Sequence, residues 1–161
     1  SVANRKVKYI GVFVILLSLL AIGCQSADKR SNKANELCGF LKSIDETSIT
    51  IDEVEYITPK NSQRMKELNL TEEDLLSGYY IYNLEEKTKE YLLTSDTVYN
   101  FIDWGRNFTD SDDPEKVNIS TTDINDFIQY INTYTNSQPN MPFFFEIDGE
   151  NVVSITEKPM A

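Results

Sequence analysis

Residues 142–156 read PFFFEIDGENVVSIT, and this stretch decides the fold class. Two apolar runs, Pro142–Ile147 and Asn151–Thr156, flank the turn Asp148-Gly149-Glu150. Runs rich in aromatic and β-branched residues on either side of a Gly-containing turn are typical of a β-hairpin. The sequence therefore predicts that the folded region ends in two antiparallel strands.

A second hairpin is predicted at the other end of the folded region. Leu37–Ile44 and Ser48–Ile57 are strand-like runs on either side of a short polar turn. In the second run, the apolar residues occupy alternate positions up to Ile51 and the opposite positions from Val54 onward. Because a strand changes faces in this way only where a residue is inserted, we expect a β-bulge near Asp52-Glu53.

The segment between the hairpins mixes short helices and strands. We expect strands at Tyr79–Leu84, Lys89–Thr94 and Thr97–Trp104, a loop over Trp104–Val117, and short helices beginning at Thr58-Pro59 and at the capping-box pair Thr71 and Asp74. The clearest helix begins at Thr121 or Thr122 and continues to Tyr134. Its apolar residues follow the i, i+3, i+4, i+7 spacing of a helix with one buried face.

This order of elements predicts an α+β fold that is mainly antiparallel β. Strands and helices do not alternate as they would in a parallel sheet. We expect a small, partly open, OB-like barrel of about six strands, because an open flat sheet leaves its edges unpaired. One long helix would close one end, and one or two short helices would complete the fold. A two-layer sheet with helices on one face is the alternative.

The N-terminus has the three parts of a secretory signal. Arg5, Lys6 and Lys8 form a basic region, which an uncharged apolar run from Tyr9 to Gly23 follows. As a helix this run would be about 22 Å long at 1.5 Å per residue, shorter than the ~30 Å hydrocarbon core of a bilayer. The segment therefore fits a signal peptide better than a permanent membrane span.

The end of this segment reads Leu20-Ala21-Ile22-Gly23-Cys24 and resembles the lipobox of bacterial prolipoproteins. In that family a small residue precedes a cysteine that receives a diacylglyceryl group and becomes the first residue after cleavage. The resemblance implies that Gly23 is the small residue and that Cys24 is lipidated. Ala21 departs from the pattern, which more often has a larger aliphatic residue there. A plain secretory signal or a signal anchor with an incidental cysteine is the alternative.

The resemblance covers only residues 1–24, and it implies a cellular location for the rest of the chain. We expect a signal peptide at 1–23, a lipidated N-terminus and flexible tether at 24–35, and a single β-rich domain at 36–161. The expected location is the cell membrane, with the protein anchored by lipid on the extracytoplasmic face. The membrane is then a partner through the N-terminal lipid.

Charge excludes one class of partner. The chain has 15 Lys and Arg against 26 Asp and Glu, and three of the basic residues but none of the acidic ones lie in the signal segment, so the remainder carries a formal charge of −14. A surface this negative repels phosphate backbones, and we expect no nucleic-acid partner. The charge does not exclude a protein, peptide or glycan ligand.

Composition also limits the chemistry. The chain has no histidine, which removes the usual general base, the commonest zinc ligand and the Ser–His and Cys–His nucleophiles. Lipidation of Cys24 leaves Cys38 as the other cysteine, so we expect no internal disulfide, and a buried apolar role for Cys38. The acidic loop Asp110–Glu115 lacks the glycine of a calcium-binding EF-hand loop, so we expect no metal site. We also expect no cofactor.

The candidate ligand contacts are Trp104, Asp103, Arg106 and Tyr80. The first three place a large ring, an acid and a base where a strand gives way to a loop. Exposed tyrosine and tryptophan beside carboxylates form a platform for sugars, peptides or cationic ligands. In the alternative interpretation, Trp104 closes the barrel end and Arg106 pairs with Asp103.

These observations favour a non-catalytic binding module over an enzyme. The first alternative is a histidine-free hydrolase of cell-wall glycan, which requires two facing carboxylates in a cleft. The second is a structural or assembly protein of the envelope, which a large exposed apolar patch would mark.

Overall fold

The computed structural model describes residues 34–109 and 113–157, all of which belong to one compact unit, Lys33–Ala161. The predicted signal peptide, Cys24 and almost all of the predicted tether lie outside the described residues. Residues 110–112 of the acidic loop also lie outside them. Among the residues that are described, no helix is long and apolar enough to cross a membrane.

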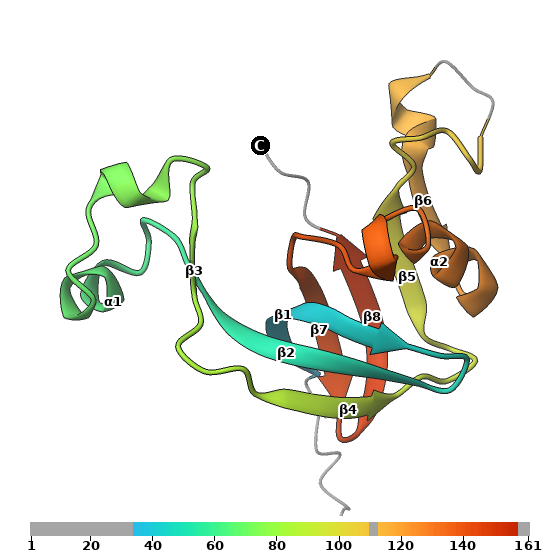
Figure 1. Cartoon of the computed structure of the whole chain (residues 1–161), viewed down its shortest axis with the longest axis horizontal. Helices are drawn as coiled ribbons and strands as arrows, with labels where there is room; N and C mark the ends of the chain where they lie inside the picture. Colours follow the sequence, from blue (N-terminus) through green and yellow to red (C-terminus); the bar gives the residue numbers. More distant parts are fainter. Residues whose placement is uncertain (1–33, 110–112, 158–161) are drawn as a thin grey trace, which may run out of the picture. The chain divides into compact units, whose positions relative to one another are not determined.

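The strands and helices follow one another along the chain as shown in Figure 1. The strands are β1 (Asn35–Ile44), β2 (Ser48–Ile57), β3 (Tyr80–Tyr82), β4 (Thr88–Leu92), β5 (Val98–Ile102), β6 (Asn118–Thr121), β7 (Phe143–Asp148) and β8 (Asn151–Glu157). The α-helices are α1 (Ser62–Glu67) and α2 (Ile124–Ile131), and the 3₁₀ helices are η1 (Glu72–Leu75), η2 (Pro114–Val117) and η3 (Thr135–Ser137).

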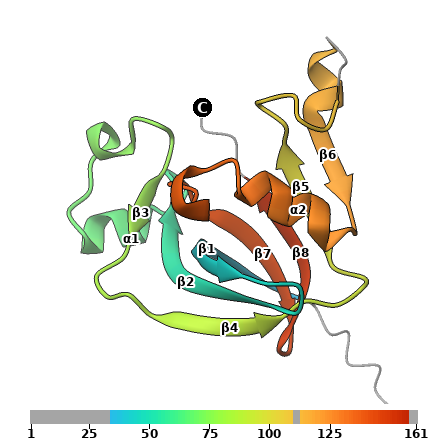
Figure 2. The same cartoon turned by 45° about the vertical axis from the view of Figure 1, so that its right-hand side comes forward.

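The eight strands form one mainly antiparallel sheet with few short helices, so the predicted α+β class is confirmed at this level. The strand order is β3-β2-β1-β7-β8-β5-β6, and β4 pairs with β2 and β8 (Figures 1 and 2). The sheet has eight strands and not about six. One of the additional strands is β6, which forms directly after the loop that the sequence predicts over Trp104–Val117.

Both predicted hairpins are present. The pairs β1–β2 and β7–β8 are antiparallel, and Gly149 in the second turn adopts a φ of +61°, which glycine tolerates without steric cost. The hairpin β7–β8 lies in the middle of the sheet. Its outer neighbour β5 runs parallel to β8, with Val98 opposite Ser154 and Asn100 opposite Thr156. This parallel pair joins β5 and β6 to the other strands of the sheet.

The predicted bulge near Asp52-Glu53 is wrong. The register of β1 and β2 shifts between Leu41 and Ser43 of β1, and it is continuous past Asp52. The second half of β2 is buried on both faces, because Val54 and Ile57 lie on opposite sides of the strand and both are buried. Ile51 faces the main core, whereas the buried Asp52 carboxylate accepts hydrogen bonds from Asn83 Nδ2 and Lys87 N, both at 2.9 Å.

The helix α2 covers the core but is shorter than predicted. Its N-cap is Asp123, whose carboxylate accepts a hydrogen bond from Asn125 N at 2.9 Å, and its last residue is Ile131. The helix therefore begins later than the predicted start at Thr121 or Thr122, and the hydroxyl of Thr121 accepts a hydrogen bond from Asp123 N at 3.0 Å. Aspartate is among the best N-cap residues because its oxygen satisfies an otherwise unpaired amide.

The main core lies between α2 and the inner face of the sheet. Its largest fully buried side chains are aromatic: Tyr99, Phe127, Phe143 and Phe145. The rings of Tyr99 and Phe127 stack at 4.8 Å, and those of Phe101 and Tyr130 at 4.4 Å. Aromatic residues from three elements, β5, α2 and β7, therefore meet in one place.

Residues 58–87, which we call the arm, connect β2 to β4 and contain α1, η1 and β3. The arm joins the sheet by pairing β3 with the end of β2, and α1 and η1 stand off from the other strands (Figure 1). The predicted capping box is confirmed, since Thr71 N donates to the Asp74 carboxylate at 2.8 Å. The predicted start of α1 is wrong, because Thr58 N donates to Asn61 Oδ1 and Asn61 becomes the N-cap.

Candidate functional site

The candidate site lies where β5 and β8 end side by side. Their parallel pairing stops at Asn100 and Thr156, and beyond it the side chain of Glu157 continues the contact. Ile102 N donates to Glu157 Oε2 at 2.8 Å. A buried backbone N–H needs an acceptor, and here a carboxylate supplies it beyond the last residue pair between β5 and β8. Glu157 is 4% exposed, so its carboxyl group is buried at the end of β8.

Trp104 lies against this buried carboxylate and is nevertheless exposed. Its indole Nε1 donates to Glu157 Oε1 at 3.2 Å, and its backbone N donates to Ile102 O at 2.9 Å. The side chain is 64% exposed. The polar edge of the indole is therefore bonded to the protein, and much of its surface is open to solvent.

Asp103 organises the loop that follows Trp104. Its carboxylate is buried and accepts from the backbone N–H groups of Asn107, Phe108 and Thr109 at 2.7, 2.8 and 3.2 Å. Its carbonyl accepts from Arg106 N at 3.0 Å. A carboxylate that accepts several backbone N–H groups holds a loop in one conformation. Asp103 thus acts on the shape of the loop that presents Trp104 and Arg106.

Two tyrosines of the α2 region complete the surroundings of Glu157. The hydroxyls of Tyr130 and Tyr134 are 2.8 Å apart. Burial raises the pKa of Tyr130, and hydrogen bonding to Glu157 raises it further. Burial also raises the pKa of Tyr134, against the opposing effect of its bond to Tyr130. Both phenols stay protonated at neutral pH, so they remain able to donate hydrogen bonds in this cluster.

A hollow of about 220 Å³ adjoins the same carboxylate on the β8-β5-β6 part of the sheet. Five of the residues that line it have polar side chains: Asn100, Asn118, Ser120, Thr156 and Glu157. Asn100 Nδ2 donates to Thr156 Oγ1 at 3.3 Å. Most of the lining surface is nevertheless apolar, and Glu157 is its one charged residue, in contrast to the strongly acidic chain as a whole.

A second hollow, of about 360 Å³, lies at the turn between β3 and β4. Tyr82, Leu84 and Lys87 are among the residues that line it. Lys87 Nζ pairs with Glu85 Oε2 at 3.5 Å, so two of its charged side chains already contact each other. This hollow lies beside the arm, and none of the predicted ligand contacts lines it.

The structure brings together three of the four predicted contact residues. Trp104, Asp103 and Arg106 share one loop, whereas Tyr80 is half-buried on β3, which β2, β1, β7 and β8 separate from β5 in the strand order. The Asp103 carboxylate accepts hydrogen bonds from the backbone N–H groups that follow it in the loop, and its carbonyl accepts from Arg106 N. Cys38 is buried in β1, as predicted for an apolar role.

Sequence reasoning missed Glu157, Tyr130 and Tyr134 as members of the site. Glu157 lies two residues after the buried Ile155, so strand alternation places it on the core face. An acid at a core position is the signal that would have identified it. Within the described ranges 34–109 and 113–157, no group of three or more acidic or cysteine side chains is arranged to hold a metal ion.

Comparisons with protein-family models, with characterised proteins and with the solved structures found no match to this chain.

Proposed function

We propose that this protein is a non-catalytic binding module of the bacterial cell envelope whose ligand contacts Trp104. The supporting observation is that the indole is 64% exposed while its Nε1 is bonded to the buried Glu157. An exposed ring that is already held in one orientation loses little conformational entropy when a ligand packs on it. Arg106, on the loop that Asp103 organises, is the neighbouring charged contact.

The two buried carboxylates support binding over hydrolysis. A two-carboxylate glycosidase needs one protonated acid and one carboxylate that faces the substrate or a water molecule. The oxygens of Asp103 accept three backbone N–H groups, and those of Glu157 accept Ile102 N and Trp104 Nε1. Both acids therefore serve to position the loop and the indole.

The exposed apolar side chains give little support to an assembly role. The large ones among the described residues are Leu76, Leu84, Leu92, Trp104 and Val153. They come from the end of η1, the β3–β4 turn, β4, the end of β5 and β8. An assembly surface would gather such residues into one patch.

The anchor is a separate part of this proposal. On the resemblance to the lipobox, Cys24 carries a diacylglyceryl group and holds the module on the extracytoplasmic face of the cell membrane. Intact mass of the membrane-extracted protein tests this, with Cys24→Ala as the variant. A mature chain that begins at residue 24 with added lipid mass supports the anchor, and an unmodified soluble chain contradicts it.

We also propose that five of the strands form a partly open, OB-like barrel. The pairings β1–β2, β2–β4, β4–β8, β8–β7 and β7–β1 follow one another around a ring and support this. The pairing β4–β8 consists of Leu92 opposite Asn151, beside the bond from Leu92 N to Glu150 O at 2.8 Å. Slow hydrogen exchange of the Leu92 amide is the expected result, and exchange at the rate of an exposed loop would argue against closure there.

Trp104 itself reports on binding, because it is the one tryptophan of the chain. We would titrate the full-length protein with three probes: an N-acetylglucosamine trimer, an uncharged extended peptide and a trilysine peptide. At least one probe is expected to change the Trp104 fluorescence in a saturable way. Calorimetry with Trp104→Ala should then show no binding, whereas Leu76→Ala, an exposed residue of the arm, should bind normally. If no probe binds, the proposed function is wrong.

The role of Glu157 in orienting the indole has its own test. Glutamine at this position has one acceptor oxygen where glutamate has two, so Ile102 N and Trp104 Nε1 would compete for it. Glu157→Gln is expected to lower the fluorescence anisotropy of Trp104 and to weaken binding of the active probe, with the overall circular dichroism unchanged. Unchanged anisotropy would show that Glu157 does not orient the ring.

A further inference from the structure

We propose that the ligand is an uncharged carbohydrate, with one sugar ring on Trp104 and the hydroxyls of a neighbouring ring in the hollow at β8-β5-β6. This inference rests on the proposed function and gives that ligand a chemical class. It requires that the indole and the hollow act together, that the lining suits sugar hydroxyls, and that other ligand classes fit less well.

The indole and the hollow are connected through two shared residues. Ile102 and Glu157 both line the hollow. The same two residues hold Trp104, because its backbone N donates to Ile102 O at 2.9 Å and its Nε1 donates to Glu157 Oε1 at 3.2 Å. Trp104 itself does not line the hollow, so a ligand on the indole must extend past Ile102 or Glu157 to enter it.

The lining of the hollow matches the groups that a sugar presents. A sugar hydroxyl both donates and accepts hydrogen bonds, and so do the amides of Asn100 and Asn118 and the hydroxyls of Ser120 and Thr156. The C–H face of a sugar ring is apolar, and a tryptophan ring offers a large flat apolar surface to it. Ile102 adds an aliphatic contact between the two.

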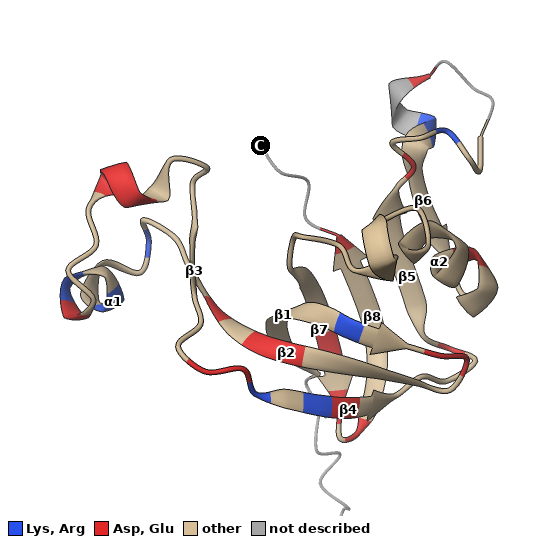
Figure 3. Cartoon of the chain, viewed as in Figure 1, with Lys and Arg blue, Asp and Glu red and all other residues tan. Residues whose placement is uncertain are grey.

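Charge argues against ionic ligands. The chain carries a formal charge of −11 and repels polyanions, and the strands that line the hollow carry few charged residues (Figure 3). A cationic ligand would need an available carboxylate. Glu157 is the one charged residue of the lining, and its oxygens already accept from Ile102 N and Trp104 Nε1.

A peptide that adds to the sheet as a strand is also a poor fit for the hollow. Strand addition requires unpaired backbone groups at a sheet edge. The free edge on this side of the sheet belongs to β6, because β5 is paired on both sides. An added strand would pair along the outside of β6, whereas the hollow is also lined by residues of β5 and β8.

Size sets the length of the ligand. The hollow of about 220 Å³ is smaller than the ~300–1,000 Å³ of typical small-molecule pockets, which suits one ring and not a whole oligomer. The remaining rings would lie outside it, and the proposal assigns one of them to the exposed ring of Trp104. A trisaccharide is therefore long enough to place one ring in the hollow and one ring on Trp104, with a third ring left over.

The test compares neutral and charged probes on the full-length protein. An N-acetylglucosamine trimer and a maltotriose are the neutral sugars, and trilysine is the charged control. Variants are Asn118→Ala in the hollow and Asn140→Ala, an exposed asparagine outside it, as the matched control. We expect at least one sugar to change the Trp104 fluorescence, with at least tenfold weaker binding in Asn118→Ala and unchanged binding in Asn140→Ala.

The outcomes separate this inference from the function it rests on. If a peptide probe binds at Trp104 and neither sugar does, the carbohydrate class is wrong and the binding module stands. If a sugar binds equally well to Asn118→Ala and to a second hollow variant, Thr156→Ala, the hollow is not part of the site and the inference is wrong. If no probe changes the Trp104 signal, both proposals fail.

Discussion

The sheet beneath α2 and the arm differ in what holds them together. Beneath α2, rings from distant parts of the chain are fully buried, among them Phe127 and Phe143, each 0% exposed. In the arm, all of which the structure describes, Leu75 is the one buried hydrophobic residue. Stability is therefore unevenly distributed, and the arm is expected to open locally while the sheet stays folded.

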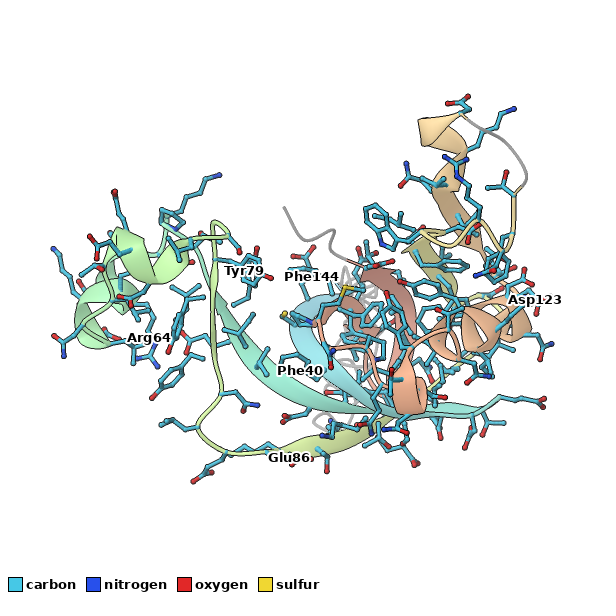
Figure 4. The ribbon with its side chains drawn as sticks, turned by 45° about the horizontal axis from the view of Figure 1, so that its top comes forward. Phe40, Arg64, Tyr79, Glu86, Asp123 and Phe144 are labelled. Carbon is cyan, nitrogen blue, oxygen red and sulfur yellow. The ribbon has the colours of Figure 1, made fainter. Side chains whose placement is uncertain are left out.

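Contacts at the base of the arm compensate for its small core. Arg64 of α1 bonds Glu55 of β2 at 2.7 and 3.1 Å and lies over the ring of Tyr82 at 5.3 Å from its centroid. Tyr79 stacks on Tyr56 with ring centroids 5.0 Å apart, and Tyr56 contacts Phe144 of β7 edge-on. Figure 4 shows Tyr79 and Phe144 pointing toward each other between the arm and the sheet.

The largest effect is expected from Phe127→Ala. Removing a fully buried ring costs about 3–5 kcal/mol through lost burial and the cavity that remains. Global unfolding in urea, followed by circular dichroism, should show this loss. Gln129→Ala on the exposed face of the same helix should stay within about 0.5 kcal/mol of the wild type. A loss below about 1 kcal/mol for Phe127→Ala would contradict the central role of the aromatic core.

Leu75→Ala should affect the arm more than the whole protein. Its side chain is 5% exposed, but an arm that opens by itself limits the effect on global unfolding. We expect faster hydrogen exchange of arm amides, unchanged exchange in β7 and β8, and a smaller shift of the urea midpoint than for Phe127→Ala. The adjacent Leu76→Ala, 92% exposed, is the control. Equal acceleration in the arm and in β7 would show that the two regions unfold together.

Tyr99→Phe should change the response of the sheet to alkali. Burial raises the pKa of Tyr99 to about 12 from an ordinary value of 10.0. The unfolded chain therefore loses this proton first, so the stability that is present below pH 10 falls as the pH rises toward 12. Urea midpoints between pH 9 and 12 should decline less steeply in Tyr99→Phe. A decline as steep as that of the wild type would contradict this assignment.

The smallest global effect is expected from Arg64→Ala. Exposed ion pairs contribute little to unfolding, so the urea midpoint should not change measurably. The arm should nevertheless be cleaved faster by chymotrypsin, because the bonds from Arg64 to Glu55 and Glu67 are lost. Lys66→Ala on the same helix is the matched control. Unchanged cleavage would show that the stacking of Tyr79 on Tyr56 is enough to hold the arm.

Local signals in the sequence predicted the local parts of the fold. Both hairpins depend on neighbouring residues, and so does the capping box of Thr71 and Asp74. The strand β6 was missed because Asn118–Thr121 is short and follows a polar loop. No local pattern predicts the pairing of β5 with β8, because the paired residues Val98 and Ser154 are far apart in the chain.

The candidate site also has a part that neighbouring residues predicted and a part that only the tertiary fold shows. Trp104, Asp103 and Arg106 were predicted together because they are adjacent in the sequence. Glu157 joins them only because β8 ends beside β5, so its contact with Trp104 depends on the tertiary fold. Tyr80 was grouped with them by residue type alone, and its strand lies elsewhere in the sheet.

The central position of the hairpin β7–β8 has a consequence for how the chain folds. This hairpin is synthesised after β1 to β6, yet it lies between β1 and β5 in the sheet. Until it emerges, the two halves of the sheet have no common neighbour, and Phe127 has no Phe143 to pack on. Contacts between residues far apart in sequence slow folding. A nascent chain of this protein therefore cannot complete its sheet until β7 and β8 have been synthesised.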